Sequence, residues 1–123
     1  GNARAMARVH SALACGGEVD GVRLLSEAAV ERILEPQIEG IDLTMGSKLT
    51  MGMGYGLPGE LIPLPSKRTF FWGGWGGSIA IIDLDARMSI AYAMNRMAPD
   101  LLGDARGGGI AIAAYIAYLG TLG

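Results

Sequence analysis

Phe70-Phe-Trp-Gly-Gly-Trp-Gly-Gly-Ser78 is the stretch of the chain that decides the fold and marks the candidate site. It holds both tryptophans of the chain together with four glycines, between two apolar runs that are typical of β-strands. A glycine inside a strand costs backbone entropy and provides no side chain to pack. Four glycines at the end of a strand therefore indicate a place where a ligand or another segment approaches the backbone closely.

The runs on either side of this stretch predict an antiparallel sheet. Arg68–Trp72 is the strand that leads into it, and Ser78–Leu84 is the strand that leaves it. A short polar turn then connects to a third run, Met88–Asn95. Strands joined by such short connections pair antiparallel, because a parallel pair needs a crossover of about a dozen residues or more.

Upstream of these strands, large residues alternate with glycine from Met51 to Leu57. Successive side chains of a strand point to opposite faces, so this pattern predicts a strand with one bare face that another segment can approach. The following segment, Pro58–Ser66, contains three prolines and is predicted to be a surface loop. Residues 37–48 show no clear period and are interpreted as a loop as well.

Helices are predicted at both ends of the chain. Asn2 can cap a first helix, and Ser26 can cap a second helix that ends before Pro36. The apolar segment from about Leu101 to Leu119 is predicted to be a third helix, weakened by three consecutive glycines within it. The predicted fold class is therefore α+β, an antiparallel sheet flanked by helices. The single domain, 1–123, is divided into a helical segment at 1–36, antiparallel strands at 49–97 and a C-terminal helix at 100–120.

The composition indicates a globular domain without an obvious charged partner. Of the 123 residues, 50% are hydrophobic and 18% charged, which excludes a disordered segment. A net charge of −2 gives no electrostatic reason to expect a nucleic acid or a membrane as partner. The apolar run Ile110–Leu119 is too short to cross a bilayer. Neither a metal nor a cofactor is expected, because the lone cysteine, the lone histidine and the scattered carboxylates have no metal-ligand spacing.

The cellular compartment stays open. Cys15 cannot form an internal disulfide, so nothing implies an oxidising environment. Neither a secretory signal nor a methionine opens the chain, which is therefore expected to be a fragment or a processed product. The cytoplasm is weakly favoured.

The Trp-Gly-Gly-Trp run can serve a reaction through its backbone. If Trp72 ends a strand, the residues after it present N–H groups at the sheet edge, with no side chain at Gly73 or Gly74 in the way. Such donors can hold the oxyanion that develops during acyl transfer, and removing one can cost about a hundredfold or more in rate. A glycine-rich hairpin whose tryptophans only cap the core explains the same residues. Residue chemistry alone leaves both interpretations open.

Motifs that would supply a nucleophile or bind a nucleotide are absent or incomplete. No serine of the chain is followed by a lysine three residues later, as a Ser-x-x-Lys pair requires. Gly76-Gly-Ser-Ile-Ala80 approaches the nucleophile elbow but lacks its last glycine, so Ser78 is interpreted as structural. Gly54–Gly59 matches G-x-G-x-x-G, but a proline-rich loop follows where a helix should hold a pyrophosphate. A dinucleotide site is therefore not expected.

Several motifs follow one another in an order that resembles one known family. The segments are Gly52-Met-Gly-Tyr-Gly-Leu57, Phe71-Trp-Gly-Gly-Trp-Gly-Gly-Ser78, Asp83-Leu-Asp-Ala-Arg87 and Ala91-Tyr-Ala-Met-Asn-Arg-Met97. Together they resemble the C-terminal portion of the serine β-lactamase/penicillin-binding-protein-like hydrolases, and most closely the class C β-lactamase-like esterases. The early segment from Ala7 to Ser26 is similar to the family's helix, Gly-Gly turn and Leu-Leu-Ser lead-in. The resemblance thus covers nearly the whole chain and implies the C-terminal part of the β-lactamase/transpeptidase-like fold.

The resemblance also implies roles for the Trp-Gly-Gly-Trp run. The family's third active-site motif is Lys-Thr-Gly in classical β-lactamases and often His-Gly-Gly or Trp-Gly-Gly in esterase-like branches, which Trp72-Gly73-Gly74 matches. The family's oxyanion hole uses the N–H of the nucleophile and that of the residue after this motif, here the backbone N–H of Trp75. Trp72, Gly73 and Gly74 would then line the pocket for a small ester or amide substrate.

The chain departs from the family in the motifs that it lacks. The family's Ser-x-x-Lys and Tyr-x-Asn/Ser motifs lie upstream of the matched part, and neither is present here. The resemblance therefore implies the C-terminal part of a serine hydrolase that is inactive alone. Its expected partners are the missing N-terminal portion of the same hydrolase or further copies of this chain. The alternative is a non-catalytic interaction module that keeps the sheet and binds a partner by strand addition or helix docking.

Overall fold

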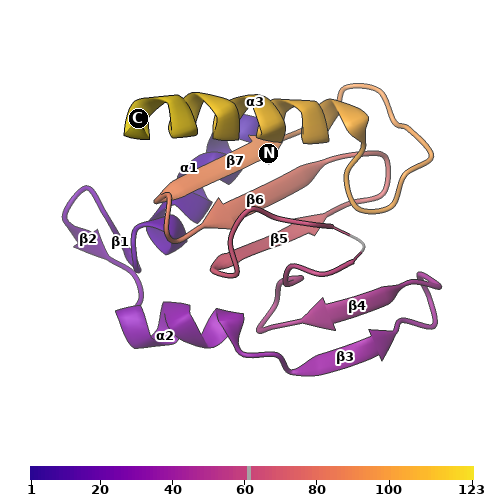
Figure 1. Cartoon of the computed structure of the whole chain (residues 1–123), viewed down its shortest axis with the longest axis horizontal. Helices are drawn as coiled ribbons and strands as arrows, with labels where there is room; N and C mark the ends of the chain where they lie inside the picture. The colour runs from indigo at the N-terminus through magenta and orange to yellow at the C-terminus, as the bar shows by residue number, and fades with distance from the viewer. Residues whose placement is uncertain (61) are drawn as a thin grey trace.

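A sheet around the glycine–tryptophan stretch is the centre of the computed structural model, which describes residues 1–60 and 62–123 (Figure 1). Its middle strand, β6 (Ile79–Asp83), pairs with β5 (Thr69–Gly73) on one side and with β7 (Met88–Tyr92) on the other. Both pairs are antiparallel, and Trp72 lies opposite Ala80. These three strands confirm the prediction made from the runs that flank the glycines.

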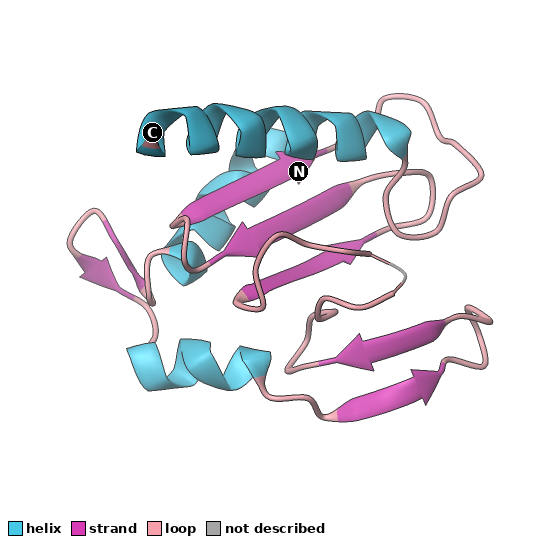
Figure 2. Cartoon of the chain, in the orientation of Figure 1, coloured by secondary structure: helices cyan, strands magenta, loops and turns pink. Residues whose placement is uncertain are grey.

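The first helix, one of those drawn in cyan in Figure 2, begins where its capping residue predicts. α1 (Ala3–Ala14) starts after Asn2, whose side-chain oxygen accepts the N–H of Ala5 at 2.9 Å. A short hairpin follows, made of β1 (Glu18–Val19) and β2 (Val22–Arg23). The hairpin occupies the polar segment that separates the two predicted helices.

The second helix is short and ends in a tighter turn. α2 (Glu27–Glu31) starts after Ser26, whose hydroxyl accepts the N–H of Ala29 at 3.1 Å. The chain continues as the 3₁₀ turn η1 (Arg32–Leu34) and leaves the helical conformation before Pro36. This end follows from the steric clash between a proline ring and the residue before it.

The C-terminal helix begins later than predicted. α3 (Ala105–Leu122) starts after Asp104, whose side chain accepts two backbone N–H groups of the first turn at 2.8 and 3.3 Å. The helix cannot start earlier, because Gly103 has a φ of +86°. The three glycines do not interrupt it, and Gly107 brings the helix close to the sheet: a Cβ there would lie 2.9 Å from Ile79. No helix in the described residues, α3 included, is long and apolar enough to cross a membrane.

The two faces of the sheet are covered by different helices (Figure 1). Phe70 and Ile82 are paired across β5 and β6, fully buried, and packed with Ala14 of α1. Phe71 points to the other face, where it belongs to the cluster that includes Ala111 of α3. Burying a side chain of this size stabilises the fold by about 1.5–3 kcal/mol. The alternation of side chains along β5 therefore joins α1 and α3 to one sheet.

Residues 37–48, interpreted from the sequence as a loop, contain a strand instead. β3 (Ile38–Ile41) pairs antiparallel with β4 (Lys48–Met51). All four residues of β3 are exposed, so the strand carries no alternation between buried and exposed positions. Sequence periodicity detects strands through burial, and a strand whose residues are all exposed gives no such signal. The loop interpretation was wrong for this reason.

The strand predicted from Met51 to Leu57 stops at its first residue. After β4 the chain turns, and the N–H of Gly52 donates to the carbonyl of Tyr55 at 2.8 Å. Gly56 then forms isolated bridges to Met51 and Phe71, and so links β4 to β5. The predicted strand is therefore a turn followed by one bridging residue.

The close approach of another segment, expected from these glycines, occurs at two of them. A Cβ on Gly52 would lie 1.9 Å from the carbonyl oxygen of Ile33, and one on Gly56 would lie 2.8 Å from the ring of Phe71. Gly54 instead has open space around it and a φ of +76°. Close packing therefore requires the first two glycines, whereas the backbone turn requires the third.

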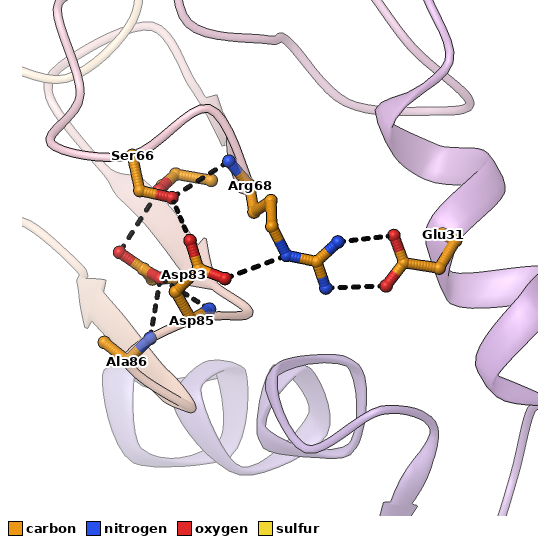
Figure 3. Close-up of polar contacts among 7 residues, drawn as sticks. Glu31, Ser66, Arg68, Asp83, Asp85 and Ala86 are labelled. Atoms are coloured by element: carbon orange, nitrogen blue, oxygen red, sulfur yellow. Dashed lines mark hydrogen bonds and ion pairs between the residues drawn. The ribbon is translucent and has the colours of Figure 1, made fainter.

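An ion-pair network fixes the start of β5 to α2 (Figure 3). The Arg68 guanidinium donates to both carboxylate oxygens of Glu31 at 2.6 and 2.7 Å, and to Asp85 at 2.8 Å. The hydrogen bonds from Arg68 hold the pKa of Glu31 below its usual value. Since all three side chains are about half exposed, water screens the charges and each pair contributes at most about 1 kcal/mol.

A buried carboxylate lies next to this network. Asp83 accepts the N–H groups of Asp85 and Ala86 at 2.9 Å (Figure 3). It also accepts the hydroxyls of Thr69 at 3.2 Å and Tyr115 at 2.8 Å. Asp83 is only 2% exposed, and these donors offset the cost of removing its charge from water. Burial raises the pKa of the Tyr115 phenol. The cluster ties α3 to the start of β5.

Candidate active site

The glycine–tryptophan stretch forms the end of β5 and the turn that leads to β6. Trp72 lies in the strand and is 36% exposed, and Trp75 lies in the turn and is 64% exposed. Gly76 and Gly77 are buried. The tryptophans therefore face the surface, which argues against a hairpin whose tryptophans only cap the core.

Gly73 and Gly74 lack a side chain for different reasons. A Cβ on Gly73 would lie 2.8 Å from the carbonyl carbon of Leu102, so this glycine makes room for the segment before α3. A Cβ on Gly74 would meet nothing within 4 Å. Both positions were expected to leave the backbone accessible, and of the two only Gly74 opens to the surface.

The N–H groups of this turn are used unequally. Three of them donate within the chain: Gly74 to the Ser78 carbonyl at 2.9 Å, Gly76 to Asp100 at 2.9 Å and Gly77 to Gly74 at 3.3 Å. The N–H of Trp75 donates to no residue that the structure describes. Because a backbone donor needs a partner and Trp75 is exposed, this group can meet water or a ligand. The backbone donor predicted at Trp75 is thus left unused by the described residues, and its catalytic role stays a prediction.

The segment before α3 packs against the inner side of the turn. The Gly76 carbonyl accepts the N–H of Ala98 at 2.9 Å and Nη2 of Arg106 at 3.3 Å. Nε of Arg106 also donates to Asp104, the cap of α3, at 3.0 Å. This contact holds the pKa of Asp104 below its usual value and raises that of Arg106.

Sequence reasoning missed these two residues. Asp104 could have been found, because an aspartate before an apolar helical segment is a capping signal. Nothing in the sequence connects Arg106 with a turn 30 residues earlier.

Ser78 and two methionines form the inner border of the turn. The Ser78 hydroxyl contacts Met94 Sδ at 2.6 Å and lies 3.4 Å from the Met94 N–H, as expected of a structural serine. A Cβ on Gly76 would lie 2.9–3.0 Å from the terminal methyls of Met94 and Met97, so the border is apolar. Among the described residues, no group of three or more His, Cys, Asp or Glu side chains could hold a metal ion.

This arrangement can contribute one component of a site for acyl transfer. An N–H without an internal partner at the end of a strand, beside aromatic side chains, can bind a carbonyl oxygen and the oxyanion that forms from it. A helix-covered antiparallel sheet with this edge is the architecture of the β-lactamase/transpeptidase-like proteins. Residues 1–115 match the Beta-lactamase family, and the chain belongs to this family.

Relatives of the chain include esterases and a penicillin-binding protein homologue. It is 34% identical over 103 residues to Esterase/beta-lactamase LipL from Mycobacterium tuberculosis (strain ATCC 25618 / H37Rv), a match that covers 81% of this chain and 23% of LipL. The crystal structure of a family VIII carboxylesterase matches with a TM-score of 0.87 and 34% identity over 94% of this chain and 31% of that one. A penicillin-binding protein homologue from Caulobacter crescentus matches with a TM-score of 0.84 and 34% identity, over 93% and 31%.

These comparisons confirm the family resemblance and the fold class that it implied. The chain spans about a quarter of its curated relative and about a third of the two solved structures.

Proposed function

We propose that this chain is the C-terminal part of a β-lactamase-like serine hydrolase that cleaves small esters or amides through an acyl-enzyme. The observation that carries the proposal is the Trp75 N–H, a backbone donor in an exposed residue that has no internal partner among the described residues. It lies at the end of β5, directly after the Trp72-Gly73-Gly74 segment that matches the family's third active-site motif. The esterases among the relatives favour an ester substrate.

In the proposed reaction this chain stabilises charge and does not form the covalent bond. A serine outside this chain attacks the substrate carbonyl, and the Trp75 N–H holds the oxygen as it becomes negative. One donor of this kind is worth about a hundredfold or more in kcat, because it is fixed before the charge develops. Trp72 and the bare Gly74 form the wall against which the acyl group rests.

The serine and its base would come from the N-terminal portion of the same hydrolase. Two surfaces of this chain support such a partner. In the described residues no strand pairs with the outer edge of β7, and unpaired edges accept further strands. α3 exposes Ile112, Ile116 and Leu119, each more than 60%, beside an apolar cavity of about 450 Å³. Exposed apolar area of this kind marks an interaction surface.

The test is to join this chain with the polypeptide encoded directly upstream of it. The purified pair is assayed with a nitrophenyl ester, beside each part alone. We expect hydrolysis only from the pair. Hydrolysis by this chain alone would show that the nucleophile is not missing.

Two variants of one residue separate the backbone donor from the side chain. Trp75→Pro removes the N–H and is expected to lower kcat about a hundredfold or more. Trp75→Ala keeps the N–H and is expected to lose much less. Equal losses in both variants, with unchanged circular dichroism, would contradict the donor role.

The second candidate function is a non-catalytic interaction module, favoured by the same free edge of β7. A stable pair that contains a Ser-x-x-Lys motif and still hydrolyses no ester or amide would support this function instead.

A further inference from the structure

Arg106 and Asp104 lie outside the glycine–tryptophan stretch but touch it directly. A Cβ on Gly77 would lie 1.9 Å from Asp104 Oδ2 and 3.1 Å from Nη2 of Arg106. Both side chains therefore pack against the bare Cα of Gly77. Asp104 does so from the N-cap of α3 and Arg106 from its first turn.

Arg106 joins four separate pieces of this region. Its guanidinium donates to Asp104, to the Gly76 carbonyl at 3.3 Å and to the Arg96 carbonyl at 2.8 Å. It also lies over the ring of Tyr92, 5.7 Å from the centroid. A planar guanidinium with several fixed donors can hold such a set, whereas a lysine ammonium has no matching fork.

The direction of the Trp75 N–H depends on this assembly through a single peptide plane. The Gly74–Trp75 peptide is planar and trans, so its C=O and N–H point in opposite directions. Its carbonyl, that of Gly74, accepts the N–H of Gly77 at 3.3 Å. Fixing the position of Gly77 therefore fixes the plane, and with it the direction of the Trp75 N–H.

The glycines of the turn do not hold this plane rigidly by themselves. Gly76 and Gly77 have φ values of +101° and +115°, conformations that only glycine adopts easily. Glycines place few restrictions on their own backbone, so external contacts must select one conformation. Those contacts come from the Asp100 carbonyl, the Ala98 N–H and Arg106.

We propose that Arg106, with Asp104, is a positioning pair that aims the Trp75 N–H by clamping the Gly76-Gly77 turn against the start of α3. The proposal rests on the proposed function, in which that N–H is the oxyanion donor. Neither residue touches the substrate, and their effect passes through Gly77 and the Gly74–Trp75 peptide.

The first readout needs no activity. The two tryptophans of the chain are Trp72 at the end of β5 and Trp75 in the turn, so tryptophan emission reports on this region of the molecule. In Arg106→Ala we expect a shifted emission maximum, stronger acrylamide quenching and about tenfold or faster amide exchange at Gly77. Arg106→Lys should keep the charge but not the fork, and Asp104→Asn should keep the helix cap but not the ion pair, so both are expected to fall between wild type and Arg106→Ala.

Arg68→Ala is the matched control. It removes an arginine with the same kind of carboxylate partners from the other end of β5, and we expect it to leave the tryptophan emission and the Gly77 exchange rate unchanged. A merely structural role for Arg106 predicts instead that both arginine variants alter stability while the turn stays as it is.

The second readout is the kinetics of the pair formed with the upstream polypeptide. Misplacing a catalytic group by about 1 Å can cost about a hundredfold, so Arg106→Ala should lower kcat about 10- to 100-fold. KM should change less than about threefold, because the donor acts mainly on the transition state. Arg106→Lys should recover part of the loss.

The proposal is overturned if Arg106→Ala matches Arg68→Ala in emission, in Gly77 exchange and in kcat. It is also overturned if KM rises while kcat stays constant. If the wild-type pair hydrolyses nothing, the proposed function fails, and emission and exchange alone then decide whether Arg106 and Asp104 hold the turn.

Discussion

The two ends of strand β5 are both held by an arginine with carboxylate partners, but among the described residues only the arginine at the far end also binds a backbone carbonyl of the neighbouring turn. At the start, Arg68 joins Glu31 and Asp85 through side chains alone, and the neighbouring Asp83 is surrounded by donors. At the far end, Arg106 reaches a backbone carbonyl of a glycine turn.

The two ends of β5 also differ in whether a hydrogen-bonding group is left without a partner. The polar atoms of Asp83 are fully used inside the protein, which is what anchoring requires. At the far end the Trp75 N–H donates to no described residue, although its neighbours all donate internally. Complete hydrogen bonding makes the start of β5 an anchor, and one unused donor makes its end a candidate site.

The largest effect on stability is expected from Gly77→Ala, which changes the turn at the far end of β5. A side chain at φ +115° strains the backbone, and its Cβ would overlap Asp104 Oδ2. We expect the free energy of unfolding to fall by about 2–4 kcal/mol, measured by urea denaturation of residues 1–123.

Gly108→Ala is the control for this substitution. Gly108 lies near the start of α3, and a Cβ there would meet nothing within 4 Å, so this substitution should be neutral or stabilise by about 1 kcal/mol. Equal stability of Gly77→Ala and wild type would show that the turn tolerates another shape.

A smaller effect is expected from Tyr115→Phe at the anchored end. The change removes a donor from the buried carboxylate of Asp83 and should cost about 1.5–3 kcal/mol. Tryptophan emission should not change, because the cluster lies at the opposite end of β5.

The stability difference between wild type and Tyr115→Phe is expected to depend on pH. Burial raises the pKa of the Tyr115 phenol above its unfolded value near 10.0, so its contribution is complete below that pH and is lost as pH rises through the raised value. The difference in unfolding free energy between wild type and Tyr115→Phe should therefore shrink only in strong alkali. Tyr118→Phe is the control, and a loss as large as that of Tyr115→Phe would contradict the assignment.

The smallest effect is expected from Glu31→Gln. The pair with Arg68 is half exposed, so its loss should cost about 1 kcal/mol or less at neutral pH. Because Arg68 lowers the pKa of Glu31 from 4.5, the contribution is complete above that pH and disappears as pH falls through the lowered value. Denaturation curves of wild type and Glu31→Gln from about pH 7 to about pH 3 measure this contribution. A stability difference that grows in acid would contradict the pairing of Glu31 with Arg68.

Strands and helices were predictable wherever burial or capping leaves a mark in the sequence. Phe70 and Phe71 alternate between two covered faces, and Asn2 and Ser26 cap helices where they were expected to. β3 was missed because all of its residues are exposed and give no alternation of buried and exposed positions. The strand from Met51 to Leu57 was misjudged because glycine alternation has more than one cause.

The location of the candidate site was predictable from the sequence, but its contacts with distant residues were not. The sequence located the donor turn, because glycines and tryptophans concentrate there. It did not separate Gly73, which makes room for Leu102, from Gly74, which opens to the surface. It could not connect Arg106 with Gly76, since that contact exists only after α3 has packed on the sheet.

By itself the sequence determined the family, the antiparallel strands around Phe70–Ser78 and the position of the candidate donor, because local pattern and motif order carry that information. Only the tertiary structure decided which N–H groups of the turn are already used and which side chains hold the turn in place. The physical reason is that a backbone N–H stays available only if no acceptor reaches it. The acceptors that could do so lie in distant parts of the chain, and the sequence does not show where they lie.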